Sequence, residues 1–197
     1  MKPSKSLLLL AAFATMIISC KKDDSNASTN KIEGTWKFAG VSAHTEATDI
    51  TTSADGTSKS ITFSDYVSTK NVGTVSLTGG KFANVGVGYD VNTTMTNISI
   101  DGDTRDTLTV PYTFSSPAAS SAGTYRLAGD SIFFGASLVT APGNEDIPSA
   151  NVTGGKISWS GDTLVITGKL SVAYSSTIEG VTISVNETAL TTTKLVK

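Results

Sequence analysis

Apolar and polar residues alternate along most of this chain, which is the period of strands that bury one face. The longest run extends from Leu164 to Tyr174 and keeps its apolar positions on one parity without a break. At about 3.3 Å per residue it predicts a strand of about 36–40 Å. The same period recurs in ten further stretches, so the sequence predicts roughly ten strands. These stretches lie near residues 32–38, 61–67, 73–78, 83–100, 108–114, 125–127, 132–134, 157–159, 181–185 and 189–196.

Turn-forming residues separate these stretches and fix the predicted connections. Short turns are expected at Gly79-Gly80, Asp101-Gly102-Asp103, Gly129-Asp130 and Gly161-Asp162. Three longer loops are expected at residues 42–59, 115–122 and 137–155, because these stretches are polar or rich in small residues and proline. Gly86 and Gly88 indicate bends in their strand, and a break in parity after Met95 predicts a β-bulge.

The predicted fold class is therefore all-β. Beyond the N-terminal segment we find no convincing apolar stripe with a helical period. An antiparallel up-and-down meander with one apolar face hides its edges best by closing into a β-barrel. A β-sandwich is the alternative. Pro111 lacks an N–H donor and is expected on an edge strand or at a bulge.

The N-terminal segment has the features of an export signal. Lys2 and Lys5 precede an apolar run from Leu7 to Ile18, which is too short to span a bilayer and typical of a signal peptide. Ile17-Ile18-Ser19-Cys20 resembles a bacterial lipobox, which implies cleavage before Cys20 and acylation of Cys20 with fatty acids such as palmitate. The alternative is an ordinary signal peptide with a cysteine there by chance.

Lys21-Lys22-Asp23-Asp24 resembles the surface-export signal of Bacteroidetes-type lipoproteins. Together these resemblances imply a lipid-anchored protein of the outer membrane, exposed at the cell surface. The predicted organisation is a signal peptide over 1–19, a lipidated cysteine and tether over 20–31, and one β domain over 32–197.

Charge and cysteine content narrow the function classes. Without residues 1–19 the chain has 13 basic and 17 acidic residues, a net charge of −4, which disfavours nucleic-acid binding. Cys20 is the single cysteine of the chain, so its acylation leaves no thiol for a disulfide or a metal site.

Several short motifs resemble the lipocalin-like lipoproteins of Bacteroidetes: Gly34-Thr35-Trp36, the strand–Gly-Asp–strand units 125–132 and 159–164, and the ending 189–196. The resemblance implies a monomeric barrel that binds a small hydrophobic or amphipathic ligand at its mouth. It also implies a basic residue over the tryptophan, for which Lys194 is the match. The candidate ligand-binding residues are the aromatic residues expected in the interior, namely Trp36, Phe38, Tyr112, Tyr125, Trp159 and Tyr174.

The rival hypothesis is a β-sandwich without a cavity that binds glycan or an envelope protein through loops 42–59 and 137–155. Such a platform leaves several aromatic rings exposed and coplanar. Phe82 and Phe133, which we place on the outward parity, distinguish the two hypotheses.

Catalytic and metal motifs are weak. His44 is the single histidine and lies in a predicted loop, and no Gly-x-Ser-x-Gly motif is present. Asp101, Asp103 and Asp106 do not follow the order of an EF-hand loop, so we interpret them as turn residues. Glycoside hydrolysis by carboxylates that meet only in space stays open. We expect no enzyme activity, no cofactor and no metal.

One recurrence predicts modification. Thr107, Ser131 and Thr163 each follow an aspartate and precede an aliphatic residue, which is the pattern used for O-glycosylation of exported Bacteroidetes proteins. The alternative is that each aspartate ends a turn and a strand begins after it.

Overall fold

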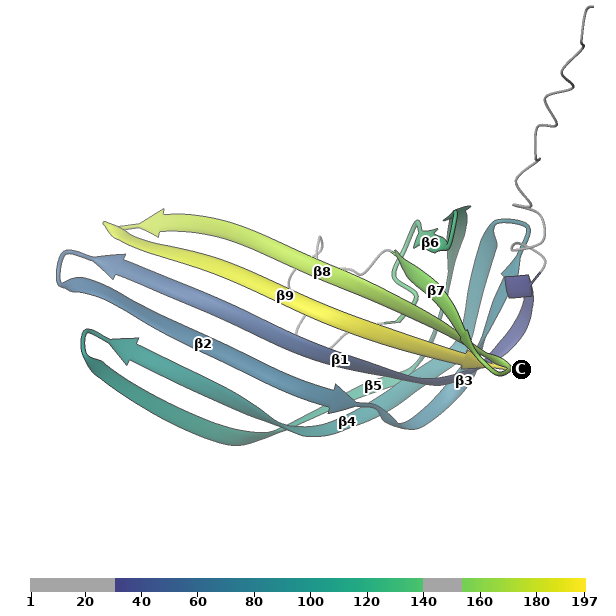
Figure 1. Cartoon of the computed structure of the whole chain (residues 1–197), viewed down its shortest axis with the longest axis horizontal. Helices are drawn as coiled ribbons and strands as arrows, with labels where there is room; N and C mark the ends of the chain where they lie inside the picture. The colour runs from purple at the N-terminus through teal and green to yellow at the C-terminus, as the bar shows by residue number, and fades with distance from the viewer. Residues whose placement is uncertain (1–30, 140–153) are drawn as a thin grey trace, which may run out of the picture.

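The computed structural model describes residues 31–139 and 154–197, and this part of the chain forms nine antiparallel strands in a single sheet (Figure 1). The all-β meander predicted from the sequence is confirmed. The strands are β1 (Gly34–Ser53), β2 (Gly56–Val67), β3 (Thr69–Thr78), β4 (Lys81–Asp101), β5 (Thr104–Ala128), β6 (Ser131–Phe134), β7 (Gly154–Ser160), β8 (Thr163–Ile178) and β9 (Val181–Val196).

Eight of these strands close into a hydrogen-bonded ring, which makes the fold barrel-like. The ring runs β1–β3–β4–β5–β6–β7–β8–β9 and returns to β1. Its side chains on the inward parity form the hydrophobic core. We call this part of the molecule the ring.

The long strands continue past the ring as a second part, which we call the extension. Here β2 takes the place of β3, so the strand order becomes β5–β4–β2–β1–β9–β8. The three hairpin tips β1–β2, β4–β5 and β8–β9 lie together at one end of the molecule, and the C-terminus lies at the other (Figure 1).

Ser68 marks the point where β2 gives way to β3 beside β1. The Val41 N–H donates to Ser68 Oγ and the Ser68 N–H donates to the Val41 carbonyl, both at 2.8 Å. The Asn71 side chain donates to the Ala39 carbonyl at 2.9 Å. These bonds satisfy backbone groups that the change of partner strand would otherwise leave without a ladder partner.

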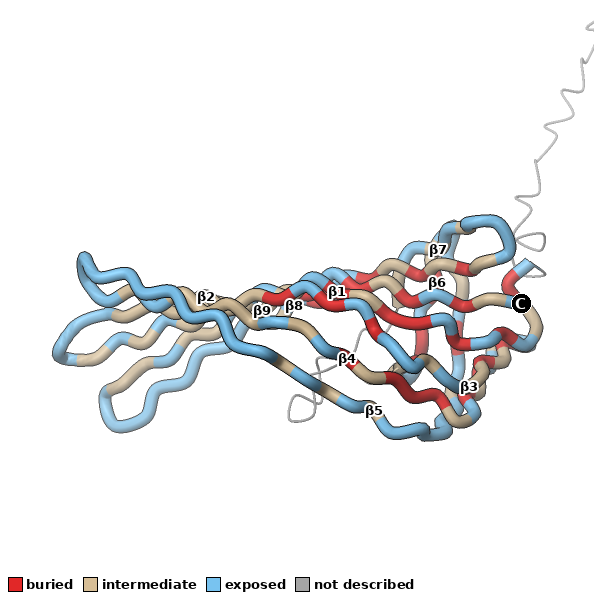
Figure 2. The backbone as a smooth tube through the Cα atoms, turned by 90° about the horizontal axis from the view of Figure 1, so that it is seen from below, coloured by how far each residue is buried: buried red, intermediate tan, exposed pale blue. Residues whose placement is uncertain are grey.

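Burial is concentrated in the ring (Figure 2). Phe38, Val75, Leu77, Leu164 and Leu195 are all fully buried there, each contributing about 1.5–3 kcal/mol relative to exposure. In the extension most side chains are half-buried or exposed, because it is a single layer with solvent on both faces.

The end of the ring that lies away from the hairpin tips is sealed by two tryptophans; we call it the closed end. Trp36 is 1% exposed, and its indole centroid lies 5.8 Å from that of Trp159. Its Nε1 donates to the Ile32 carbonyl at 2.8 Å. Lys197 Nζ lies 4.8 Å from the Trp36 ring centroid. The match of Lys194 to the capping position is therefore wrong: Lys194 pairs with Val165 and faces outward.

The predicted loop over residues 42–59 is wrong, since β1 and β2 cover it with a tight turn before Gly56. These residues lack an apolar period because neither face of the extension is deeply buried. The small-residue stretch 115–122 is likewise part of β5. Most of the predicted loop 137–155 lies outside the described residues.

Two bulge predictions have different outcomes. Pairing of β4 with β5 is continuous from Asp90 to Asp101, so the bulge predicted after Met95 is wrong. Met95 and Ile98 therefore lie on opposite faces of the sheet, and both are half-buried, because both faces of the extension accept apolar residues. The bend expected near Gly86 is confirmed as a register shift between Asn84 and Val87.

The prediction that Phe82 faces outward is wrong. The extra residue at Val85–Gly86 turns the side chains that precede it on β4 to the opposite face. Phe82 is therefore 2% exposed, and its aromatic ring packs edge-on against that of Phe134, with the centroids 5.4 Å apart. Val85 is consequently 61% exposed. Phe133 does face outward, with the Arg126 guanidinium 4.1 Å above its ring.

Pro111 lies on β5 where β4 is its partner strand and none of the described strands lies on the other side of β5, as expected for an edge position. Among the described residues no helix is long and apolar enough to cross a membrane.

Candidate functional site

Two compensating bulges lie where β4 and β5 pass from the ring to the extension. Asn84 pairs with Ser121, Val87 with Ala119 and Tyr89 with Ser116, so β4 carries one extra residue first and β5 carries one next. The β4 bulge contains Gly86 at a φ of +60°, and the β5 bulge contains Pro117, which has no N–H to leave unpaired. The bulges interrupt the regular hydrogen-bond ladder between β4 and β5 at this point.

A cleft of about 460 Å³ opens beside these bulges. It lies between residues 137–139, which follow β6, and the stretch of β5 whose one described neighbour is β4. Its described lining residues are Asn84, Val87, Tyr89, Phe114, Ser115, Ser116, Pro117, Ala119, Ser121, Ser137, Leu138 and Val139. None of these is charged, so this lining offers apolar surface, hydroxyls and one amide. We call it the β5 cleft.

Aromatic rings connect the β5 cleft to the core. The Phe114 and Tyr89 ring centroids lie 6.0 Å apart, and those of Tyr89 and Phe38 also lie 6.0 Å apart. Burial, with Tyr112 nearby, raises the pKa of the neighbouring Tyr66 to about 12. Burial also raises the pKa of Tyr89, with smaller contributions from Tyr66 and Tyr112. These phenols are therefore neutral at physiological pH.

Asn84 is the buried polar residue of the β5 cleft, 5% exposed. Its Nδ2 donates to Ser121 Oγ at 3.1 Å and to the carbonyl of Leu138. Its Oδ1 is buried and accepts no hydrogen bond from the described residues. Such a group carries a desolvation cost until a donor reaches it.

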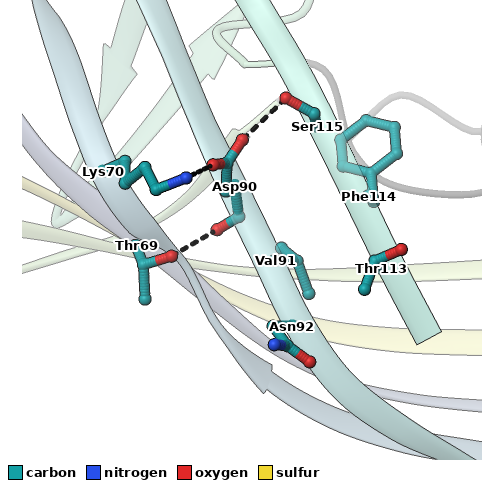
Figure 3. A pocket seen from close by; sticks show the side chains of 8 residues that line it. All are labelled: Thr69, Lys70, Asp90, Val91, Asn92, Thr113, Phe114 and Ser115. Atoms are coloured by element: carbon teal, nitrogen blue, oxygen red, sulfur yellow. Dashed lines mark hydrogen bonds and ion pairs between the residues drawn. The ribbon is translucent and has the colours of Figure 1, made fainter. Parts of the chain in front are cut away.

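A second hollow of about 410 Å³ lies next to the β5 cleft and shares Phe114 and Ser115 with it (Figure 3). Its charged groups are paired: Lys70 Nζ lies 2.7 Å from Asp90 Oδ2, and Ser115 Oγ donates to Asp90 Oδ1 at 2.6 Å. The Lys70 ammonium, followed by Ser115, holds the pKa of Asp90 below its usual range. This hollow therefore adds no net charge beside the cleft.

The six predicted ligand residues do not gather at one site. Trp36, Phe38 and Tyr125 are buried in the ring core, and Trp159 packs against it. Tyr112 is half-buried on β5, and Tyr174 is 52% exposed on the extension. None of the six is among the described residues that line the β5 cleft.

The sequence pattern indicates only some of the residues that line the β5 cleft. Tyr89 and Phe114 fall on the inward parity of their predicted strands, and Gly86 and Gly88 indicate the irregular backbone. Asn84 falls on the outward parity in the sequence, and the β4 bulge turns it inward together with Phe82. Its hydrogen-bond partner Leu138 is 54 residues away.

The other predicted sites are dispersed. Thr107 is exposed, and Ser131 and Thr163 are half-exposed at the starts of β6 and β8. His44 lies on β1, not in a loop, with Nδ1 2.8 Å from Asp65 Oδ1 at the surface. In residues 31–139 and 154–197 no group of three or more histidine, cysteine or acidic residues is placed to hold a metal. Cys20 lies outside the described residues.

No family model, no curated protein and no solved structure matches this chain.

Proposed function

We propose that this protein is an outer-membrane lipoprotein, anchored through Cys20 and exposed at the cell surface, that binds a small hydrophobic or amphipathic molecule in the β5 cleft. The anchoring rests on the lipobox-like stretch before Cys20. The binding rests on one observation: a cleft with aromatic and aliphatic walls and a few hydroxyl and amide groups opens beside the ring.

The size and chemistry of the β5 cleft support this proposal. A volume of about 460 Å³ falls in the range of about 300–1,000 Å³ that is typical of small-molecule sites. Phe114, Val87 and Leu138 supply apolar surface, and the serine hydroxyls supply hydrogen bonds. The arrangement suits binding better than acid–base catalysis, because its described polar groups are hydroxyls and an amide.

The position of the proposed site differs from the lipocalin-like expectation. A ligand would enter from the side of the molecule beside β5, and not between the hairpin tips. The rival glycan platform has less support, because residues 42–59 form strands and Phe82 is buried.

Native mass spectrometry tests the proposal. The full chain is made by cell-free translation with Cys20→Ser, which removes the thiol that would be acylated. It is then exposed to bacterial envelope extract. We expect a discrete added mass on this protein. We expect the added mass to be lost in Phe114→Ser and retained in the matched control Tyr174→Ser, which changes an exposed aromatic residue on the extension.

Circular dichroism of both variants verifies that they are folded. A bare polypeptide mass with every extract, or an added mass that survives Phe114→Ser, would contradict binding in the β5 cleft. Glycan and envelope-protein capture would then be the next experiments.

A further inference from the structure

The amide of Asn84 has a fixed orientation. Only its NH₂ group can donate to the carbonyl of Leu138, and the same Nδ2 also donates to Ser121 Oγ. The Oδ1 atom is therefore the acceptor that is left over. It is buried and meets no donor among the described residues, while the residue itself is 5% exposed and lines the β5 cleft.

A buried acceptor without a donor is unfavourable in the empty protein. A ligand that brings a donor to Oδ1 removes that cost, whereas a ligand without a donor leaves it in place. The acceptor can thus select between ligands of the same apolar shape.

The surroundings of Oδ1 also limit the charge of the ligand. The described residues that line the β5 cleft include no acid and no base, and the nearby Lys70–Asp90 pair is internally neutralised. A cationic head group would lose hydration without gaining a counter-charge. A carboxylate would present only acceptors to the Asn84 oxygen.

We infer that the β5 cleft takes a neutral amphiphile whose head group is an alcohol, with the hydroxyl donating to Asn84 Oδ1 and the aliphatic body lying against Val87, Phe114 and Leu138. This inference rests on the proposed function and names its ligand class. It assigns specificity to Asn84, while the apolar walls supply most of the affinity.

The experiment compares three ten-carbon probes by isothermal titration calorimetry against the full chain carrying Cys20→Ser. Decan-1-ol has a hydroxyl donor, decyl methyl ether has the same chain without a donor, and decanoate at pH 8 has acceptors only. We expect decan-1-ol to bind about tenfold more tightly than the ether, as one buried hydrogen bond of this kind provides. Decanoate should bind no better than the ether.

Two variants assign the preference to the acceptor. Asn84→Leu removes Oδ1, so the alcohol and the ether should bind equally, with the ether affinity changed less than about threefold. Ser121→Ala removes a neighbour of Nδ2 but keeps Oδ1, so the tenfold preference should persist.

Equal binding of alcohol and ether by the parent chain would overturn the inference, as would a preference that survives Asn84→Leu. If Asn84→Leu does not fold, the three-probe comparison on the parent and on Ser121→Ala decides alone. Failure of all three probes to bind would count against the β5 cleft as a binding site, which is the failure of the proposed function and is recognised separately.

Discussion

Gly88 packs closely against the backbone of β5 around the β5 bulge. A Cβ built on Gly88 would lie 2.8 Å from the backbone N of Ala118 and 2.9 Å from the carbonyl oxygen of Ser116. Both neighbours are backbone atoms, so they cannot move aside as a side chain would. We predict that Gly88→Ala lowers the free energy of unfolding by about 1–3 kcal/mol, which is typical of overpacking.

The matched control is Gly129→Asn in the β5–β6 turn. Gly129 has a φ of +59° and open space where a Cβ would stand, and asparagine tolerates this conformation. Its effect should stay within about 0.5 kcal/mol. Urea denaturation followed by tryptophan fluorescence measures both variants, and equal effects would mean that the bulge is not tightly packed.

Because Tyr66 has a raised pKa in the folded protein, we predict that the free energy of unfolding falls at alkaline pH. Its pKa is raised to about 12 in the folded protein from 10.0, so between these values the unfolded chain releases a proton that the folded chain keeps. The contribution is fully present below pH 10 and is lost as the pH rises toward 12. A difference of one in pKa between the folded and unfolded states corresponds to about 1.4 kcal/mol, so the loss is of order 2–3 kcal/mol.

Tyr66→Phe keeps the ring and removes this titration. Denaturation of the parent and the variant at pH 8, 10 and 11 should show a shallower decline for Tyr66→Phe. Parallel declines would mean that another group controls alkaline unfolding.

The ring and the extension should differ in local stability, because only the ring has a covered core. We predict that hydrogen exchange is slowest at ring positions such as Val75, Leu77 and Leu164. Amides beside the three hairpin tips should exchange at least about 100-fold faster, since local opening there exposes little additional apolar surface. Hydrogen-exchange mass spectrometry on peptides from both parts makes the comparison. Equal protection would show that another surface covers the extension in solution.

The same contrast explains which elements the sequence could predict. The parity from Leu164 to Leu170 is clear because the ring buries one side of β8 and leaves the other outside. Residues 42–59 have no such contrast, because both faces of the extension meet solvent and Thr45, Asp49 and Ile50 are all acceptable there. The strands in that region are held by pairing with neighbours on both sides, and a one-dimensional pattern does not record pairing.

The six aromatic residues predicted to bind a ligand do not line the β5 cleft, for a related reason. The aromatic residues chosen from the sequence are mostly core residues, and inward parity does not distinguish a packed interior from a lined cleft. The β5 cleft arises where two bulges and a distant segment meet, so its key polar residue, Asn84, could not be found from local pattern.

At the scale of the whole molecule, the closed end and the hairpin tips lie at opposite ends (Figure 1). Lys31 contacts Trp159 at the closed end, with Nζ 4.1 Å from the ring centroid, so the chain enters the domain there. β9 alone has 16 residues between the tips and that end, a span of about 50 Å at about 3.3 Å per residue.

If Cys20 carries the proposed lipid and this lipid holds the entry point near the bilayer, the molecule stands upright and its tips become its outermost part. An approaching antibody, phage or protease would then meet the β1–β2, β4–β5 and β8–β9 turns first, while the β5 cleft would face along the membrane. Energy transfer from a dye on Asp103 to a bilayer probe would read this height directly, and a short distance would mean that the molecule lies flat.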